Sequence, residues 1–316
     1  MKVTIPKGKY VVAVSGGVDS MVLLDILAKQ VTGYRLRTIE KKKINSNLQP
    51  TTSNLDLVVA HFNHGIRPDA PKDEELVGKV AKRYNLPFEV GYGKLGSNAS
   101  EDKAREARYH FLNKTLKKYG ADKIITAHHQ DDLLETAILN TLRGTGRRGL
   151  TALADNSNIL RPLMSKSKKD ILAYAKKNRL DWREDESNQD EKYLRNYIRH
   201  RIIPKLSRKE EQEFLQKLSR SRATNRIINQ EIANLSQKIV KNNRIDRPSF
   251  IDLPTEVASE ILIHYLRQNE ISGFDRRTID RLTTVIKTAM PGSRHDVTRG
   301  AVFLVTAKEA HLATPD

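Results

Sequence analysis

The sequence of 316 residues contains no cysteine. This absence excludes, within the chain, disulfides, thiolate zinc sites, iron–sulfur clusters, cysteine nucleophiles and persulfide carriers. Long apolar runs are missing as well, since the N-terminal apolar strand is interrupted at Ser15, well short of a signal peptide or a membrane span. We therefore expect a cytoplasmic protein with no membrane partner.

Acidic residues are few compared with basic ones, because 38 Asp and Glu stand against 56 Lys and Arg and give a formal net charge of +18. Two segments, residues 195–208 and 217–226, carry several basic side chains and no acid. This excess favours nucleic acid as a partner, since Lys and Arg displace counterions from a phosphate backbone. A solvated basic face is the alternative. An anionic membrane surface is disfavoured because no aromatic-rich amphipathic helix is present.

The first half of the chain alternates apolar strand patterns with helical patterns. The expected strands are residues 10–14, 57–62, 87–90 and 123–127, and the expected helices are 18–30, 72–84, 98–119 and 131–142. This alternation predicts an α/β fold in which a parallel sheet has helices on both faces. Ligands of such a fold collect at the carboxyl ends of the strands.

Two domains are expected, with a boundary near Ser207, so that residues 1–207 form the α/β domain and residues 208–316 a smaller all-helical one. Helical spacing supports helices over residues 209–240, 255–267 and 277–288, and residues 301–306 resemble a closing strand. The polar stretch 33–54 has neither a helical nor an alternating pattern and is interpreted as an insertion.

A glycine-containing loop joins the first strand to the first helix. It consists of Ser15, Gly16, Gly17, Val18, Asp19 and Ser20. Adjacent glycines, a helix start and two hydroxyls suit a phosphate group. Asp19 would face an anion there, which is unfavourable unless it holds a cation, so we assign it to magnesium. The loop is not a Walker loop, because GxxxxGK[ST] and its lysine are absent. The alternative is a glycine turn with an N-cap serine.

Basic and imidazole side chains follow the second strand and line the third helix. His61, His64 and Arg67 leave the second strand together, and Arg67 precedes a proline, which favours a loop position suited to phosphate. As a metal site this cluster is weak, and packing or capping is the alternative for His61. Arg105 and Arg108 share one helical face, for which solvated helix charge is the alternative.

A third cluster follows the fourth strand and contains Asp132 and Glu135 on one helical face. Two carboxylates held close can share a cation or a proton, and one of them can have its pKa raised into the range of a base. Helix capping is the alternative role for these acids. The basic, glycine-rich loop 143–149 suits a nucleotide backbone. Arg195 and Arg199 are four residues apart, so they would lie on the same face of a helix.

Taken together, these motifs resemble the tRNA(Ile)-lysidine synthetases of the PP-loop, or N-type ATP pyrophosphatase, superfamily. The segments that carry the resemblance are residues 15–20, 61–67, 104–112, 127–135, 143–150, 161–163 and 184–199, in the family's order. The resemblance implies an adenine nucleotide alpha-hydrolase-like PP-loop domain that binds ATP and catalyses the reaction, followed by a helical domain that binds tRNA.

The activity implied by the resemblance is a ligation in two steps. ATP adenylylates the carbon-2 oxygen of the wobble cytidine in an isoleucine tRNA with a CAU anticodon, and the side-chain amine of free lysine then displaces AMP to form lysidine. ATP and magnesium are the implied cofactors. The oligomeric state is left open, with a homodimer as one option.

The resemblance also implies roles for individual residues. ATP would lie on residues 15–20 with His64 and Arg67 nearby, and magnesium near Asp19. Asp132 and Glu135 match acids that recognise and activate lysine, since a carboxylate can attract an ammonium group and take its proton. Arg108 and Arg195 match arginines placed around the adenylate, where cations offset developing charge.

This sequence departs from the family pattern in three respects. The stretch 33–54 is longer than expected, the helical domain matches only loosely, and the further C-terminal domain of many members is not found before Asp316. These departures leave open how the tRNA acceptor end is held.

Three other functions compete with the ligase. A tRNA base thiolase adenylylates the same kind of oxygen but delivers sulfur, which the lack of cysteine disfavours. GMP and asparagine synthetases take ammonia from a cysteine-dependent glutaminase domain, for which the chain has no room. An RNA-binding module with an inactive nucleotide loop is disfavoured by the intact hexapeptide and by both acids of the third cluster.

Overall fold

The computed structural model describes residues 1–32, 55–65, 69–93, 96, 101–151, 153, 158–184, 191–298 and 300–313. The chain divides into two compact units, Met1–Ser219 and Arg220–Asp316. This division falls within helix α8 (Arg208–Ile239), which begins directly after the boundary predicted at Ser207. The expected insertion 33–54 lies outside the described residues.

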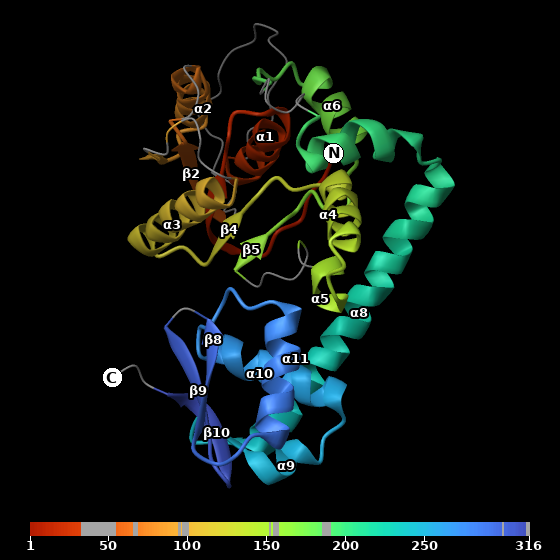
Figure 1. Cartoon of the computed structure of the whole chain (residues 1–316). Coiled ribbons are helices and arrows are strands. Elements are labelled where there is room, and N and C mark those ends of the chain that lie inside the picture. The colour runs from red at the N-terminus through yellow and green to blue at the C-terminus, as the bar shows by residue number, and fades with distance from the viewer. Residues whose placement is uncertain are drawn as a thin grey trace, which may run out of the picture. The chain divides into compact units, whose positions relative to one another are not determined.

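The first unit is built on a parallel five-stranded sheet (Figure 1). Its strands are β1 (Gly8–Ala13), β2 (Leu55–Asn63), β3 (Phe88–Tyr92), β4 (Lys123–Ile125) and β5 (Ile159–Leu160). They lie in the order β3-β2-β1-β4-β5, and every neighbouring pair is parallel. The predicted α/β class is therefore confirmed.

Helices cover both faces of this sheet, because successive side chains of β1 pack alternately against helices on one face and on the other. Tyr10 and Val12 are buried against α1 (Val18–Thr32), α2 (Ala70–Arg83) and α6 (Lys168–Lys177). Val11 points the other way and packs with Leu112 of α3 (Glu101–Tyr119). Such a period of two is what a strand buried on both sides requires.

A buried carboxylate fixes α6 and α2 to α1. Asp25 of α1 accepts hydrogen bonds from the Tyr84 hydroxyl at 2.5 Å, from the Tyr174 hydroxyl of α6 at 2.8 Å and from Lys29 Nζ at 2.7 Å. Asp25 is only 1% exposed, and a buried carboxylate needs such partners. The start of α6 is thereby held at a defined distance from the start of α1.

The chain leaves the middle of the sheet in two directions. From β1 it passes through α1 to β2, whereas from β4 it passes through α4 (Gln130–Leu142) and α5 (Arg147–Leu150) to β5 on the other side. The carboxyl ends of β1 and β4 are therefore neighbours at a topological switch point, the place where open α/β sheets bind ligands.

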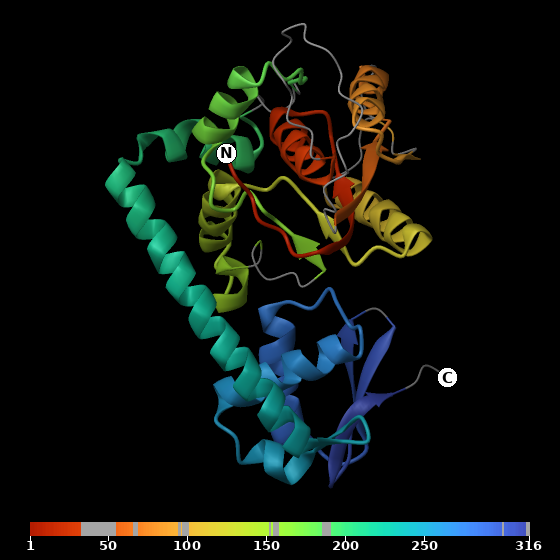
Figure 2. The same cartoon turned by 180° about the vertical axis from the view of Figure 1, so that it is seen from behind.

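The second unit contains α9 (Arg247–Ile251), α10 (Thr255–Gln268) and α11 (Arg276–Thr288), together with a sheet (Figure 2). The sheet is antiparallel, in the order β6-β7-β10-β9-β8. Its strands are β6 (Val240–Lys241), β7 (Arg244–Asp246), β8 (Ser293–Thr298), β9 (Ala301–Val305) and β10 (Glu309–Ala313).

The expectation of an all-helical second domain is therefore corrected. Helices α10 and α11 and the closing strand β9 lie where the sequence predicted them, but α9 was not predicted, and four further strands belong to the same sheet as β9. These strands have two to six residues and few β-branched or aromatic side chains, so each gives little pattern by itself. Among the described residues, no helix is long and apolar enough to cross a membrane.

Candidate active site

The glycine loop is a tight turn that leads from β1 into α1. Gly16 has φ +94°, a conformation that disfavours other residues, and an added Cβ would lie 3.3 Å from Cβ of Asp73. Ser20 closes the turn, because its Oγ accepts from the Ser15 amide at 3.2 Å and donates to the Gly17 carbonyl at 2.8 Å. The amides of the first helical turn that follow lack intrahelical acceptors, which suits a phosphate group.

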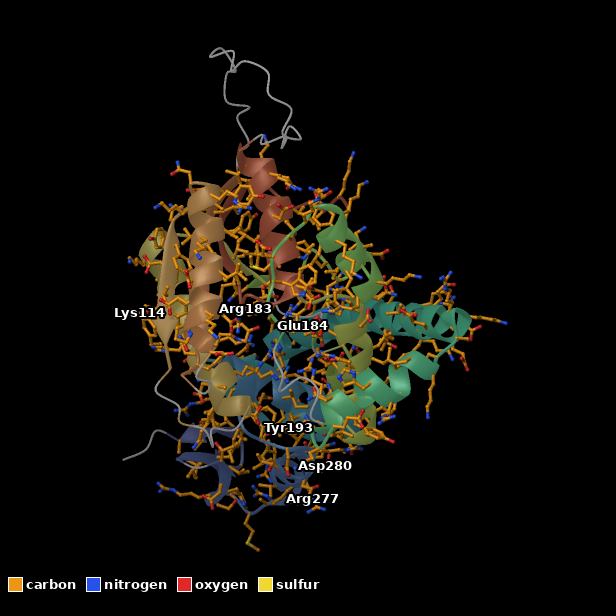
Figure 3. The ribbon with its side chains drawn as sticks, turned by 90° about the horizontal axis from the view of Figure 1, so that it is seen from above. Lys114, Arg183, Glu184, Tyr193, Arg277 and Asp280 are labelled. Carbon is orange, nitrogen blue, oxygen red and sulfur yellow. The ribbon has the colours of Figure 1, made fainter. Side chains whose placement is uncertain are left out.

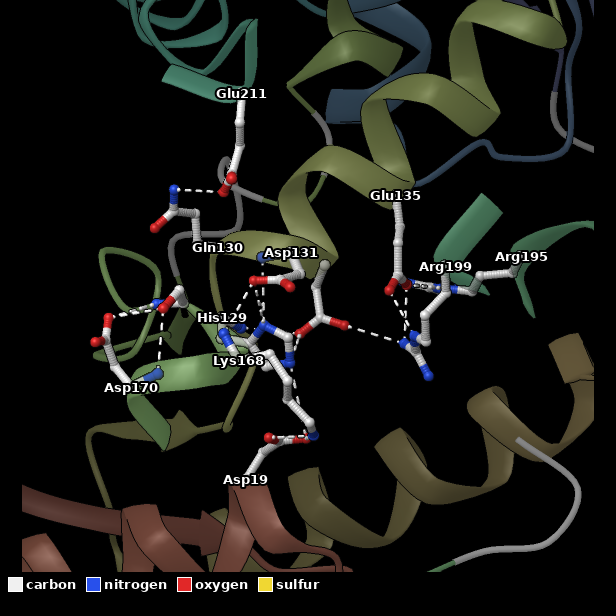
Figure 4. A network of polar contacts seen from close by, with 12 residues as sticks. Asp19, His129, Gln130, Asp131, Glu135, Lys168, Asp170, Arg195, Arg199 and Glu211 are labelled. Carbon is white, nitrogen blue, oxygen red and sulfur yellow. Dashed lines mark hydrogen bonds and ion pairs between the residues drawn. The ribbon is translucent and has the colours of Figure 1, made fainter. Parts of the chain in front are cut away.

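Asp19 lies in the first turn of α1 and faces the start of α6 (Figure 4). Its two carboxylate oxygens accept hydrogen bonds from Lys168 Nζ at 2.6 and 2.8 Å. One of these oxygens, Oδ2, also lies 3.7 Å from Nε2 of His129. Lys168 was not singled out from the sequence, since it is separated from Asp19 by 149 positions and belongs to a lysine-rich segment.

Backbone contacts fix the starts of α4 and α6 to each other. His129 caps α4, because its Nδ1 accepts from the Asp131 amide at 3.3 Å and its own amide donates to Asp132 Oδ2 at 2.8 Å. Asp131 Oδ1 in turn accepts from the Lys168 amide at 3.1 Å, and the Gln130 amide donates to the Lys166 carbonyl at 3.0 Å. Lys168 and Asp132 are therefore positioned by main-chain hydrogen bonds at two helix starts.

Asp132 and His129 form a coupled pair beside Asp19. Burial raises the pKa of Asp132, and the nearby Glu135 adds to the rise, while the His129 ring opposes it at 3.6 Å from Oδ2. Burial alone would lower the pKa of His129, but Asp131, Asp132 and Asp19 outweigh it and raise that pKa. The two groups are therefore electrostatically coupled, and each influences the protonation of the other.

Glu135 is completely buried and is held by two arginines. Arg199 donates to it twice, from Nε at 2.5 Å and from a terminal nitrogen at 2.8 Å, and Arg195 Nε donates to Oε2 at 3.2 Å. Arg199 also lies 3.5 Å from Oδ1 of Asp132, so Asp132 and Glu135 face the same side of α4. Arg195 lies on α7 (Leu194–Tyr197), and Arg199 on the π-helical turn Ile198–Ile202 that continues it.

His128 lies three residues after the end of β4 and is surrounded by positive charge. Its Nδ1 lies 2.8 Å from the Thr126 hydroxyl. Burial and the charges of four arginines lower its pKa to about 3, so the ring is neutral at physiological pH. Those arginines are, in decreasing order of effect, Arg161, Arg108, Arg105 and Arg195. The region after β4 therefore has a positive electrostatic potential and contains the neutral imidazole of His128.

The structure brings together most of the residues that were selected from the sequence. The glycine loop, Asp19, Asp132, Glu135 and Arg195 belong to one edge of the sheet (Figure 4). Arg108 lies over the Tyr109 ring, 5.6 Å from its centroid, and its charge reaches His128.

His64 and Arg67 were also predicted to bind ATP. His64 is half-buried and packs edge-to-face on the Phe62 ring at 4.8 Å. Arg67 lies outside the described residues, as do residues 185–190 of the segment 184–199.

Arg183 is a loop-positioning residue that sequence reasoning missed. Arg183 lies next to Glu184 in Figure 3. Its amide donates to the Gly16 carbonyl at 3.1 Å, and its side chain donates to Asp73 of α2 at 2.6 Å. The same Asp73 is the residue against which Gly16 packs. No local motif marks Arg183, because both of its partners lie more than a hundred residues earlier in the chain.

The carboxylates at this edge could bind magnesium only together with water molecules and the phosphates of a bound nucleotide. Among the described residues, no group of three or more His, Asp or Glu side chains could hold a metal ion. Magnesium in nucleotide sites keeps several waters and uses one or two carboxylates plus substrate phosphates. Asp19, within the glycine loop, fits the role of a single carboxylate ligand.

Comparisons with known proteins identify the family of this chain. The family model described as the PP-loop domain matches residues 2–206. A tRNA(Ile)-lysidine synthase from Thermotoga maritima is 38% identical over 208 residues, which cover 63% of this chain and 46% of that protein. One from Methylococcus capsulatus is 38% identical over 213 residues, covering 64% of this chain and 43% of that protein. The match thus spans less than half the length of either relative.

A solved U34-tRNA thiolase from Methanococcus maripaludis has 16% sequence identity and a TM-score of 0.47, over 68% of this chain and 73% of that one. A likeness at this level does not bear on substrate or chemistry.

Proposed function

Because the chain belongs to the PP-loop domain family, we propose that it is an ATP-dependent ligase that modifies transfer RNA. It would join free lysine to carbon 2 of the wobble cytidine in an isoleucine tRNA with a CAU anticodon, forming lysidine and releasing AMP and pyrophosphate. The similarity to two proteins named tRNA(Ile)-lysidine synthase supports this choice of substrate. The reaction would take place in the cytoplasm.

One observation supports the proposal most strongly: Asp19 of the phosphate-binding turn and Asp132 both lie within 3.7 Å of the His129 ring. A site for the phosphates of ATP and a carboxylate for an amine are therefore neighbours. A reaction that activates an oxygen with ATP and then admits an amine needs both groups at one place.

In the first step the carbon-2 oxygen of cytidine attacks the α-phosphorus of ATP, and pyrophosphate leaves. The amides and hydroxyls of residues 15–20 would bind the phosphates, and Asp19 would share a magnesium ion with them. Magnesium would offset the charge of the leaving group. Arg108 and Arg195 would stabilise the adenylylated base, because their positive charges lie around the carboxyl end of β4.

In the second step the lysine ammonium loses a proton, its nitrogen attacks carbon 2, and AMP leaves with the oxygen. We assign the proton to Asp132, because burial raises the pKa of this carboxyl and its Oδ1 has only a 3.5 Å contact with Arg199. Glu135 would position Arg195 and Arg199, since its oxygens already accept three hydrogen bonds.

The alternative of a tRNA base thiolase is not favoured, because a persulfide carrier requires a cysteine and this sequence has none. An RNA-binding module without catalysis is the second alternative. It predicts tRNA binding with no dependence on ATP or lysine.

A release assay for AMP tests the proposal against both alternatives. Wild-type protein should release AMP from ATP only when isoleucine tRNA and lysine are both present, and Asp19→Asn should abolish this release. Asp56→Asn is the matched control. Asp56 is an exposed carboxylate at the amino end of β2, whereas the candidate site lies at the carboxyl ends of the strands. AMP release that does not depend on lysine, or no release at all, would overturn the proposal.

A further inference from the structure

The glycine loop lacks the lysine that Walker loops carry in sequence, yet the fold brings a lysine to it from elsewhere. Lys168 stands at the first position of α6, directly after the N-cap Ser167. Its ammonium group donates to both carboxylate oxygens of Asp19, at 2.6 and 2.8 Å. The cation therefore lies at the start of α1, where a phosphate group would bind.

The position of Lys168 is set by contacts that do not depend on its own side chain. Its amide donates to Asp131 Oδ1 at 3.1 Å, which ties the residue to the start of α4. Tyr174 on the same helix bonds the buried Asp25 of α1 at 2.8 Å. Two elements next to the phosphate turn thus hold the backbone from which the lysine side chain extends.

The charges at the turn explain why a cation is needed there. Asp19 alone would repel a triphosphate, whereas the pair of Asp19 and Lys168 carries no net charge. An ammonium group has three donors, and two are directed at Asp19 here, so a third remains for an anion. The Lys168 side chain is 38% exposed, which leaves it accessible to a ligand.

We propose that Lys168 is a phosphate-binding residue that contacts the β- and γ-phosphate oxygens of ATP and holds pyrophosphate as it leaves. Asp19 would hold magnesium once the nucleotide is bound, and the ammonium group would then donate to the phosphate oxygens in place of the carboxylate. It thereby supplies the charge that the Walker lysine supplies in other nucleotide loops. This inference rests on the proposed use of ATP and adds a residue to it.

Calorimetric titration of the whole chain with ATP, pyrophosphate and AMP tests the inference without tRNA or turnover. Lys168→Met should weaken ATP and pyrophosphate binding by roughly tenfold or more, since it removes a charge-assisted hydrogen bond, and leave AMP binding unchanged. Lys168→Arg should restore most of the pyrophosphate affinity. Lys169→Met is the matched control, because Lys169 is the exposed neighbour on the same turn of α6.

A double-mutant cycle with Asp19→Asn separates phosphate binding from a merely structural ion pair. If Lys168 only neutralises Asp19, its replacement should have no effect on pyrophosphate binding once the carboxylate is gone. If it binds phosphate, Lys168→Met should weaken pyrophosphate binding in both backgrounds. Equal affinities of Lys168→Met and wild type for pyrophosphate, or a parallel loss for AMP, would overturn the inference. Wild type that binds no ATP would instead contradict the proposed function.

Discussion

Arg199 holds both oxygens of Glu135, at 2.5 and 2.8 Å, although this carboxylate has no exposed surface at all. A buried carboxylate with a bidentate guanidinium partner is fixed in place and is a poor acceptor for another group. The neighbouring Asp132 has only a looser contact with the same arginine, at 3.5 Å. Asp132 and Glu135 therefore differ in their capacity to bind a further group.

Replacing Glu135 should damage stability more than replacing Asp132. Glu135→Gln removes the buried carboxylate that binds Arg195 and Arg199, and we expect a loss of about 3 kcal/mol in the free energy of unfolding. Asp132→Asn should cost clearly less, because an amide oxygen can still cap the His129 amide. Urea denaturation of the three proteins measures this. A Glu135→Gln protein as stable as wild type would contradict the anchoring role.

The Asp132→Asn protein should stall between the two chemical steps. Its carboxylate is assigned to the incoming amine, so adenylylated tRNA should accumulate while lysine transfer falls. Rapid quenching, followed by separation of adenylylated from lysine-bearing tRNA, gives both rates. Loss of both steps to the same extent would make Asp132 a general structural or magnesium-binding residue instead.

Gly16→Ala should disrupt the phosphate-binding turn. A residue with a Cβ is strained at φ +94°, and the added carbon would press on Asp73, so the affinity for ATP should fall and the protein should be destabilised by about 1–3 kcal/mol. Gly146→Ala is the control, because an added Cβ there meets no atom within 4 Å. Nucleotide titration and thermal unfolding would detect the difference. Unchanged ATP binding by Gly16→Ala would contradict the assignment of the turn.

His128 should make the protein sensitive to mild acid. Its folded pKa of about 3 lies below the ordinary value of 6.5, so the unfolded chain takes up a proton first as the pH falls, and stability is lost below about pH 6.5. Between pH 7 and 5 this group should remove about 2 kcal/mol from the free energy of unfolding. In His128→Gln that contribution should be missing. Equal pH dependence of the variant and wild type in urea denaturation would rule it out.

The basic residues of α8 should bind tRNA phosphates without reading the sequence. Lys217, Arg220 and Arg226 are exposed on this helix, in the acid-free run 217–226. Replacing all three with Ala should weaken binding of isoleucine and methionine tRNAs by a similar factor and reduce the salt slope by roughly one unit for each phosphate that is no longer neutralised. Filter binding at several salt concentrations measures both. Weaker binding of the isoleucine tRNA alone, with an unchanged slope, would indicate direct recognition.

The sequence predicted β1 to β4 and α1 to α4 of the first unit because each of these elements has a local signal. Apolar runs mark the strands, and helical spacing marks the helices, including residues 209–240, which were found as α8. The common face of Asp132 and Glu135 follows from helical spacing, and Arg199 contacts both. The pairing of Lys168 with Asp19 and of Arg183 with Gly16 could not be predicted, because the sheet order brings distant segments together.

The central claim is that one edge of the sheet both activates the cytidine oxygen and admits lysine. Mass spectrometry of the wobble nucleoside, after incubation of isoleucine tRNA with the protein, ATP, magnesium and isotopically labelled lysine, tests it most directly. We predict a cytidine that carries one labelled lysine with wild type and with Asp56→Asn, and unmodified cytidine with Asp19→Asn. Unmodified cytidine with the wild-type chain, or a sulfur-bearing base in its place, would contradict the account.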